Sequence, residues 1–165
     1  MPEEIIVQKE IMVQELRAAQ ENLERSSRCL EEGDSGFVPT EGVMTAAQQV
    51  AHIAQTIDWF LEGVFRPEGF DMNFEKHAEE IAGVTSLAAA REWVDRSFDA
   101  AVQAVESRTP EEMAEPIAEG PIMGGAPRFA FVGAVVDHTA HHRGALTIYS
   151  RILGKTPAMP YMEGF

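Results

Sequence analysis

The residues best suited to bind a metal are concentrated in one short segment, Asp137–Gly144, which reads DHTAHHRG. It contains His138, His141 and His142. Residues four apart lie one above the other on the same face of a helix, so His138 and His142 can share a face. Paired imidazoles at this spacing bind a single metal ion in known helical motifs. A third ligand must come from elsewhere in the chain, and His52 is the best candidate.

Helical phase separates the three clustered histidines. At about 100° per residue, His138 and His142 fall within about 20° of the centre of an apolar stripe, whereas His141 lies about 80° away, at its edge. The stripe consists of Phe131, Val135, Ala145, Leu146, Tyr149 and Leu153. A buried imidazole needs a partner, because an unpaired buried polar group costs about 1–3 kcal/mol. Two stacked histidines favour a metal over hydrogen-bonded core residues.

The same count leaves the direction of His52 open. The main apolar stripe of its predicted helix is formed by Val50, Ile53, Ala54, Ile57, Leu61 and Val64. His52 points away from this stripe, on the side of Thr45, Gln48 and Trp59. Either the helix buries a second stripe that contains His52 and Trp59, or His52 is a surface residue. His77, in an acidic stretch, is expected to be exposed.

Four long helices are expected to hold these residues, at 4–31, 45–62, 87–107 and 128–153. Thr45 and Gln48 match a capping box, Ser86 can cap the third helix, and Thr109-Pro110 opens one short turn. Gly33, Gly63 and Gly154 mark helix ends. No stretch has the alternating period of a strand, so the fold class is all-α, a four-helix bundle forming a single domain over residues 1–165.

Two connections, 64–84 and 108–127, are rich in proline and glycine and are longer than antiparallel neighbours need. The first joins the second and third helices and has helical character near 74–81. The second joins the third and fourth helices. Both are expected to be crossovers or lids over a site.

The charge, hydropathy and cysteine content of the chain argue against several classes of protein. The 165-residue chain carries 13 Lys and Arg against 27 Asp and Glu, a net charge of −14, which argues against nucleic acid as a partner. The N-terminus lacks the pattern of a signal peptide, and no apolar run approaches the ~20 residues of a membrane span. With Cys29 alone, no internal disulfide can form. We therefore expect a cytoplasmic protein with no membrane association.

The sequence resembles the DinB-like family of small bacterial four-helix proteins. The matching segments are Gln49–Ala54 (QVAHIA), Asp137–Gly144 and Tyr149–Gly154 followed by Pro157. The resemblance implies a bundle in which His52, His138 and His142 hold the metal and His141 does not. It also implies homodimers formed through helices. The chain departs from the family pattern at Ala145, where Gln is common, and in its last six residues, Pro160–Phe165.

Three neutral imidazoles leave a coordination position open for water or substrate, as in catalytic zinc sites. Zinc and nickel are the expected ions, and iron or manganese are tolerated. A water at that position can supply hydroxide near neutral pH, and a thiol can be presented there as a thiolate. Relatives of the fold include thiol-dependent transferases and metal-dependent hydrolases. We therefore expect a metal-dependent transferase or hydrolase acting on a small molecule, with a low-molecular-weight thiol as a possible co-substrate. The alternatives are a non-catalytic metal-dependent binding or stress-response module, and a structural bundle with core histidines.

Several neighbouring residues are candidates for the surroundings of the metal. Each ligating imidazole needs its other nitrogen held, which Asp137, Gln48, Gln49 or Asp58 could do. Arg143 would meet an anionic substrate group or, as we favour, form a surface salt bridge on the far side of its helix. Trp59 would line the pocket or pack in the core, and Tyr149 is a further pocket candidate. The C-terminal residues Met159, Tyr161, Met162 and Phe165 could cover a partner or the mouth of the pocket.

Overall fold

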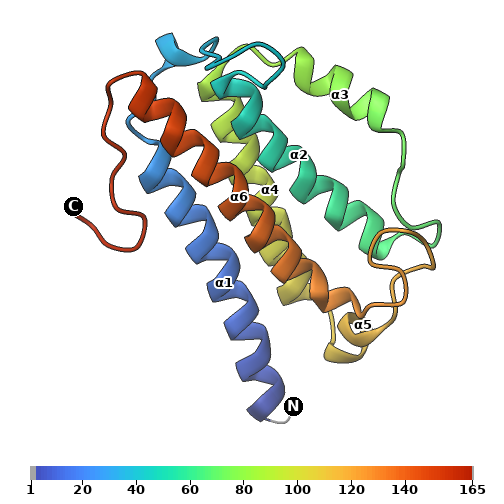
Figure 1. Cartoon of the computed structure of the whole chain (residues 1–165). Helices are drawn as coiled ribbons and strands as arrows, with labels where there is room; N and C mark the ends of the chain where they lie inside the picture. Colours follow the sequence, from blue (N-terminus) through green and yellow to red (C-terminus); the bar gives the residue numbers. More distant parts are fainter. Residues whose placement is uncertain (1–2, 165) are drawn as a thin grey trace.

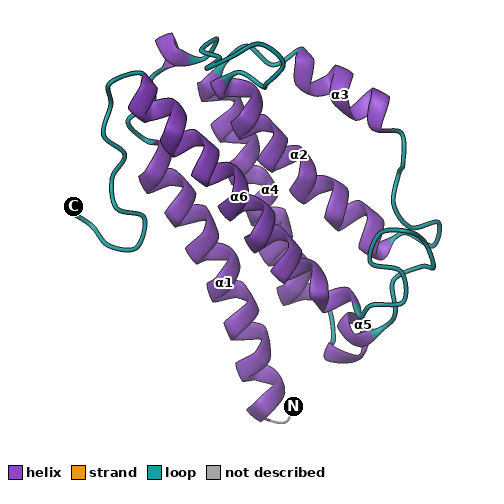
Figure 2. Cartoon of the chain, in the orientation of Figure 1, coloured by secondary structure: helices purple, strands orange, loops and turns teal. Residues whose placement is uncertain are grey.

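The computed structural model describes residues 3–164, and their side chains from residue 8 on. Within these residues all regular elements are helices and no β-strand is formed (Figure 2). The long helices are α1 (Glu3–Ser27), α2 (Ala46–Phe65), α4 (Leu87–Ser107) and α6 (Phe131–Ile152). The shorter ones are α3 (Phe74–Ala82), α5 (Pro110–Ala114) and the 3-10 turns η1 (Glu32–Asp34) and η2 (Arg128–Ala130).

The four long helices form a bundle in which α2 packs on α4 and α6, and α1 packs on the same two helices. Consecutive helices α1 and α2 therefore lie across the bundle from each other. The chain colours show α1 and α6 running in one direction and α2 and α4 in the other (Figure 1). The predicted all-α four-helix bundle is confirmed, and the adjacency of α2 and α6 brings His52 toward the histidine segment.

Side-chain caps explain where three of the helices begin. Thr45 Oγ1 accepts from the Gln48 backbone N–H while the Gln48 side chain accepts from the Thr45 N–H, as predicted. The Ser86 hydroxyl accepts from the Ala89 N–H at the start of α4. Thr109 forms the same reciprocal box with Glu112 ahead of α5. These local interactions need no distant partner, and each predicted start is confirmed.

The first helix ends earlier than predicted, at Ser27 instead of residue 31. The guanidinium of Arg91 on α4 donates to the carbonyl oxygens of Ser27 and Leu30, both at 2.9 Å. These bonds satisfy carbonyls that a helix end leaves free. The chain turns there and places Leu30 in the core at 1% exposure.

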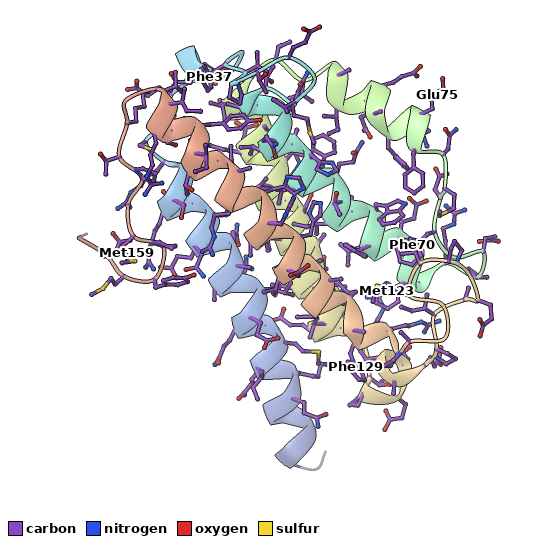
Figure 3. The ribbon with its side chains drawn as sticks, in the orientation of Figure 1. Phe37, Phe70, Glu75, Met123, Phe129 and Met159 are labelled. Atoms are coloured by element: carbon purple, nitrogen blue, oxygen red, sulfur yellow. The ribbon has the colours of Figure 1, made fainter. Side chains whose placement is uncertain are left out.

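The second helix continues past Gly63, where its end was predicted, to Phe65. Gly63 is buried within the helix, and a Cβ atom at this position would collide with the Phe70 ring. The glycine is therefore explained by the close approach of Phe70 and not by a helix end. Figure 3 shows Phe70 among the side chains at this end of α2.

The two long connections have different roles. Because α2 and α4 run in the same direction, the chain between them must return along the length of the bundle, and α3 lies on this path outside α2 (Figure 1). This connection is a crossover. The segment 108–127 stays at one end of the bundle, where α4 ends and α6 begins, so the prediction of a crossover was wrong there.

One hydrophobic core joins the four long helices. Its largest fully buried side chains include Phe98 of α4 and Phe131 of α6, together with Leu16, Ile53 and Ile57. None of the described helices combines the length and hydropathy that a membrane span would need.

Candidate metal centre

Three imidazoles converge between α2 and α6. One nitrogen from each of His52, His138 and His142 lies within 4.8 Å of the others. The Nε2 atoms of His52 and His138 are 3.3 Å apart. The ring centroid of His142 lies 4.7 Å from that of His52 and 4.4 Å from that of His138. The structure thus brings together the two histidines of the H-x-x-x-H pair and the distant histidine of α2.

A chain of hydrogen bonds holds His142 in one orientation. Gln49 Oε1 lies 2.6 Å from His142 Nδ1, Gln49 Nε2 lies 3.4 Å from Tyr149 Oη, and Tyr149 Oη lies 2.8 Å from the Met44 carbonyl oxygen. The carbonyl can only accept, so the tyrosine hydroxyl donates to it and accepts from the Gln49 amide. Gln49 Oε1 is left to accept from His142 Nδ1–H. His142 Nε2 therefore carries the lone pair that a metal needs.

His138 has no such support. Its Nδ1 atom is buried and has no hydrogen-bond partner among the described residues. Its Nε2 atom is directed at His52. The protein therefore orients His142 through a side-chain hydrogen bond, whereas Nδ1 of His138 has no such partner among the described residues.

Burial keeps these imidazoles neutral. Desolvation, with the charges of His142, His52 and His141 adding to it, lowers the pKa of His138 to about 3. Desolvation, helped by His52 and His141, lowers the pKa of His142 to about 4. Burial also lowers the pKa of His52, although the Gln55 side chain partly opposes the shift. At neutral pH all three rings are uncharged, the form that binds metals.

One pair of nitrogens already has the spacing expected for two ligands of a divalent ion. Zinc–nitrogen bonds of about 2.0–2.1 Å at tetrahedral angles place two ligating nitrogens about 3.3–3.4 Å apart. The separation of the His52 and His138 Nε2 atoms, 3.3 Å, matches this spacing. The three donors are neutral nitrogens, which suit zinc, nickel and iron. The three-histidine group is therefore a candidate site for a divalent metal.

A cavity of about 430 Å³ adjoins the centre on the α3 side of α2. His52 contributes to its wall together with residues of the 42–44 loop, α2 and α3: Gly42, Val43, Met44, Gln48, Gln55, Phe74, His77, Ala78, Ile81 and Ala82. His52 thus belongs both to the histidine group and to a space large enough for a small molecule.

Of the residues predicted to surround the metal, only Gln49 forms a hydrogen bond to a site histidine within the described part of the chain. Asp137 is exposed to solvent. Gln48 is engaged in the Thr45 capping box and donates to the Ala82 carbonyl. Asp58 accepts from the Trp93 indole at 2.7 Å. These three side chains are therefore committed elsewhere or face solvent.

Trp59 does not line the cavity beside His52. Its indole N–H donates to the Asp71 carbonyl at 2.7 Å, and its ring packs against Phe60, Phe70 and Phe74. The second face of α2 is thus covered by the crossover and α3, which explains why a single-stripe phase count left His52 unresolved. Trp59 therefore belongs to the contact between α2 and the segment that covers it.

Arg143 lies on the opposite side of α6 from the site. Its guanidinium bonds the Tyr161 hydroxyl at 3.3 Å and stands over the Tyr161 ring, 5.4 Å from its centroid. The surface salt bridge favoured from the sequence is not formed among the described residues, and the structure pairs Arg143 with an aromatic residue instead. His141 is exposed, with its ring 4.8 Å from that of His142.

The C-terminal tail packs against α1 instead of over the cavity beside His52. Arg25 on α1 bonds the Pro160 carbonyl and the Glu163 carboxylate. Met159, Tyr161 and Met162 are exposed, and Phe165 lies outside the described residues. The described residues of the tail do not line this cavity.

Sequence reasoning missed three contributors to the site. The Met44 carbonyl ends the hydrogen-bond chain, and a backbone atom leaves no residue-type signal. Gln55 follows His52 by three residues, within one helical turn, and this spacing could have singled it out. His77 was expected to be exposed but is half-buried and lines the cavity. Its Nε2 atom lies 3.3 Å from the Asp71 carbonyl oxygen.

The chain matches known proteins over most of its length. A family profile described as the DinB superfamily matches residues 15–146. YfiT from Bacillus subtilis, described as a probable metal-dependent hydrolase with an unusual four-helix bundle topology, superposes with a TM-score of 0.71 at 16% identity, over 94% of this chain and 91% of that one. A DinB-like protein from Bacillus cereus gives a TM-score of 0.70 at 20% identity, over 88% and 93%. No curated protein matches the sequence significantly. At these identities the structures show a shared fold.

Proposed function

The chain belongs to the DinB superfamily, and from this membership and the histidine geometry we propose that it is a metal-dependent hydrolase of a small molecule. His52, His138 and His142 would hold the ion, with zinc or nickel the preferred metals. The observation that carries the proposal is the convergence of three imidazole nitrogens within 4.8 Å of one another. The description of YfiT as a probable metal-dependent hydrolase supports the reaction class.

A divalent ion with three imidazole ligands would keep a coordination position open, where it polarises a substrate oxygen and lowers the pKa of water. The residues of the chain would prepare that position. The Gln49–Tyr149–Met44 hydrogen bonds set the tautomer of His142. Burial keeps all three rings neutral at the working pH. The cavity beside His52 gives the substrate a place next to the ion.

The test compares the protein loaded with zinc or nickel against the metal-free protein and against His142→Ala. Each form is assayed for hydrolysis of a panel of small esters and amides, and for conjugation of electrophiles to a low-molecular-weight thiol. Hydrolysis that requires both metal and His142 supports the proposal. Turnover only in the presence of the thiol would assign the site to a transferase. Full metal occupancy without any turnover would identify a binding module.

A further inference from the structure

The cavity between α2 and α3 has mainly apolar walls. Val43 and Met44 from the loop line it together with Phe74, Ala78 and Ile81 from α3. Its volume, about 430 Å³, lies within the range of small-molecule sites. Two of the lining residues, Val43 and Phe74, are 44% and 55% exposed. Large apolar side chains that remain exposed around an opening are typical of a binding surface.

The polar side chains of the cavity are already engaged by the protein. The Gln48 amide donates to the Ala82 carbonyl at 3.3 Å. The Gln55 amide donates to the His77 carbonyl at 3.0 Å and to the Glu80 carboxylate at 2.6 Å. His77 Nε2 pairs with the Asp71 carbonyl. These nitrogens are therefore not free to recognise a polar ligand, which favours an apolar one in the cavity.

The bonds of Gln48 and Gln55 connect α2 to α3. Gln48 and Gln55 are seven residues apart, which is about two turns of one helix face. They tether α3 to α2 at two points, and His52 lies between them on the same face. The two helices are thus bridged on either side of His52 while the space at His52 itself remains free.

We propose that this cavity binds a short apolar chain of the substrate, so that the substrates are small molecules with an alkyl or acyl group next to the reacting polar group. The inference rests on the proposed function, because it places the polar group of the substrate at the metal. His52, shared by the metal centre and the cavity, would direct the chain toward α3. Phe74 and Ala78 would then determine which chain lengths are accepted.

The test uses straight-chain hydroxamates, which bind metals through their two oxygens, on the zinc-loaded protein. Calorimetry gives the Kd of acetohydroxamate, butanohydroxamate, hexanohydroxamate and octanohydroxamate. Burial of each added methylene is worth about 0.8 kcal/mol, so the affinity should rise about fourfold per methylene until the cavity is filled. An affinity that does not depend on chain length overturns the proposal.

Two variants on α3 locate the effect. Ala78→Phe fills the cavity and should abolish the gain in affinity with chain length. Glu79→Phe is the matched control, since Glu79 is exposed on the same helix and does not line the cavity. A chain-length gain that survives Ala78→Phe places the chain elsewhere and overturns the inference.

The outcomes separate this inference from the proposed function. If the parent protein binds acetohydroxamate but its affinity does not rise with chain length, the inference about the cavity is wrong and the metal-dependent function is unaffected. A parent protein that takes up no zinc, or binds no acetohydroxamate when zinc is bound, contradicts the metal-dependent function and the inference together.

Discussion

Gln49 Oε1 lies 2.6 Å from His142 Nδ1, and this contact joins α2 to α6 at the centre of the site. Both residues are 8% exposed, so the bond is shielded from water. It fixes which nitrogen of His142 carries the proton, and therefore which one can bind a metal. The contact therefore prepares His142 Nε2 for a metal.

Replacing Gln49 by leucine should weaken metal binding. The variant keeps a side chain of similar size but removes the acceptor for His142 Nδ1–H, and the loss of such a partner lowers metal affinity by about 10–100-fold. Competition with a chromophoric chelator measures the Kd for zinc. Gln48→Leu, one position earlier and without a hydrogen bond to a site histidine, should keep the parent affinity. Equal losses in the two variants would show that the Gln49 contact has no special role.

Tyr149→Phe should affect stability more than metal binding. It removes a buried hydroxyl and leaves the Met44 carbonyl without its partner, at a cost of about 1–3 kcal/mol. The Gln49–His142 bond remains, so the Kd for zinc should rise less than in Gln49→Leu. Urea unfolding and the chelator competition give the two quantities. An unchanged free energy of unfolding would contradict the hydrogen-bond chain.

The stability of the metal-free protein should fall in mild acid. An unfolded histidine has a pKa of about 6.5, whereas burial places those of His138 and His142 at about 3 and about 4. As the pH falls from about 6.5 to about 4, the unfolded state takes up protons that the folded state does not. The free energy of unfolding must therefore decrease over this window.

Urea denaturation of the metal-free protein at a series of pH values checks this dependence. Carboxylates also titrate at the lower end of the window, so His138→Leu serves as the comparison. The variant lacks the imidazole whose pKa burial lowers to about 3, and it should lose less stability between pH 7 and pH 5 than the parent. Parallel curves for the two proteins would contradict the assignment.

Thr45→Ala should destabilise the start of α2. The substitution removes the hydroxyl that accepts from the Gln48 N–H, and loss of such a cap costs about 1 kcal/mol. Ser86→Ala at the start of α4 removes an equivalent bond and should cost a similar amount. Urea unfolding measures both. A Thr45→Ala variant as stable as the parent would show that the box does not stabilise this helix.

Sequence predicted best what depends on neighbouring residues. The starts of α2, α4 and α5 follow from Thr45, Ser86 and Thr109, each of which caps a backbone N–H three residues later. The end of α1 was missed because Arg91, which bonds the carbonyls there, comes from α4. Gly63 was misread as the end of α2 because the glycine is required by the packing of the Phe70 ring, which helical periodicity does not show. Helix ends of this kind depend on tertiary contacts.

The site shows the same division. The spacing of His138 and His142 indicates a shared face directly from helical geometry. His52 could not be oriented by phase because α2 is covered on two faces, one by the core and the other by α3 and the crossover. The partners Gln49 and Met44 lie 93 and 105 residues from His142 and Tyr149. Such pairs depend on which helices are neighbours, and periodicity along one helix does not contain this information.

The most direct test of the central claim is the metal content of the purified protein after zinc loading and exhaustive dialysis, measured by mass spectrometry of the metal. The parent protein and His141→Ala should each retain about one ion per chain, because His141 is exposed and outside the converging group. His142→Ala should retain little or none. A parent protein without stoichiometric metal, or His142→Ala with the same content as the parent, would contradict the three-histidine site.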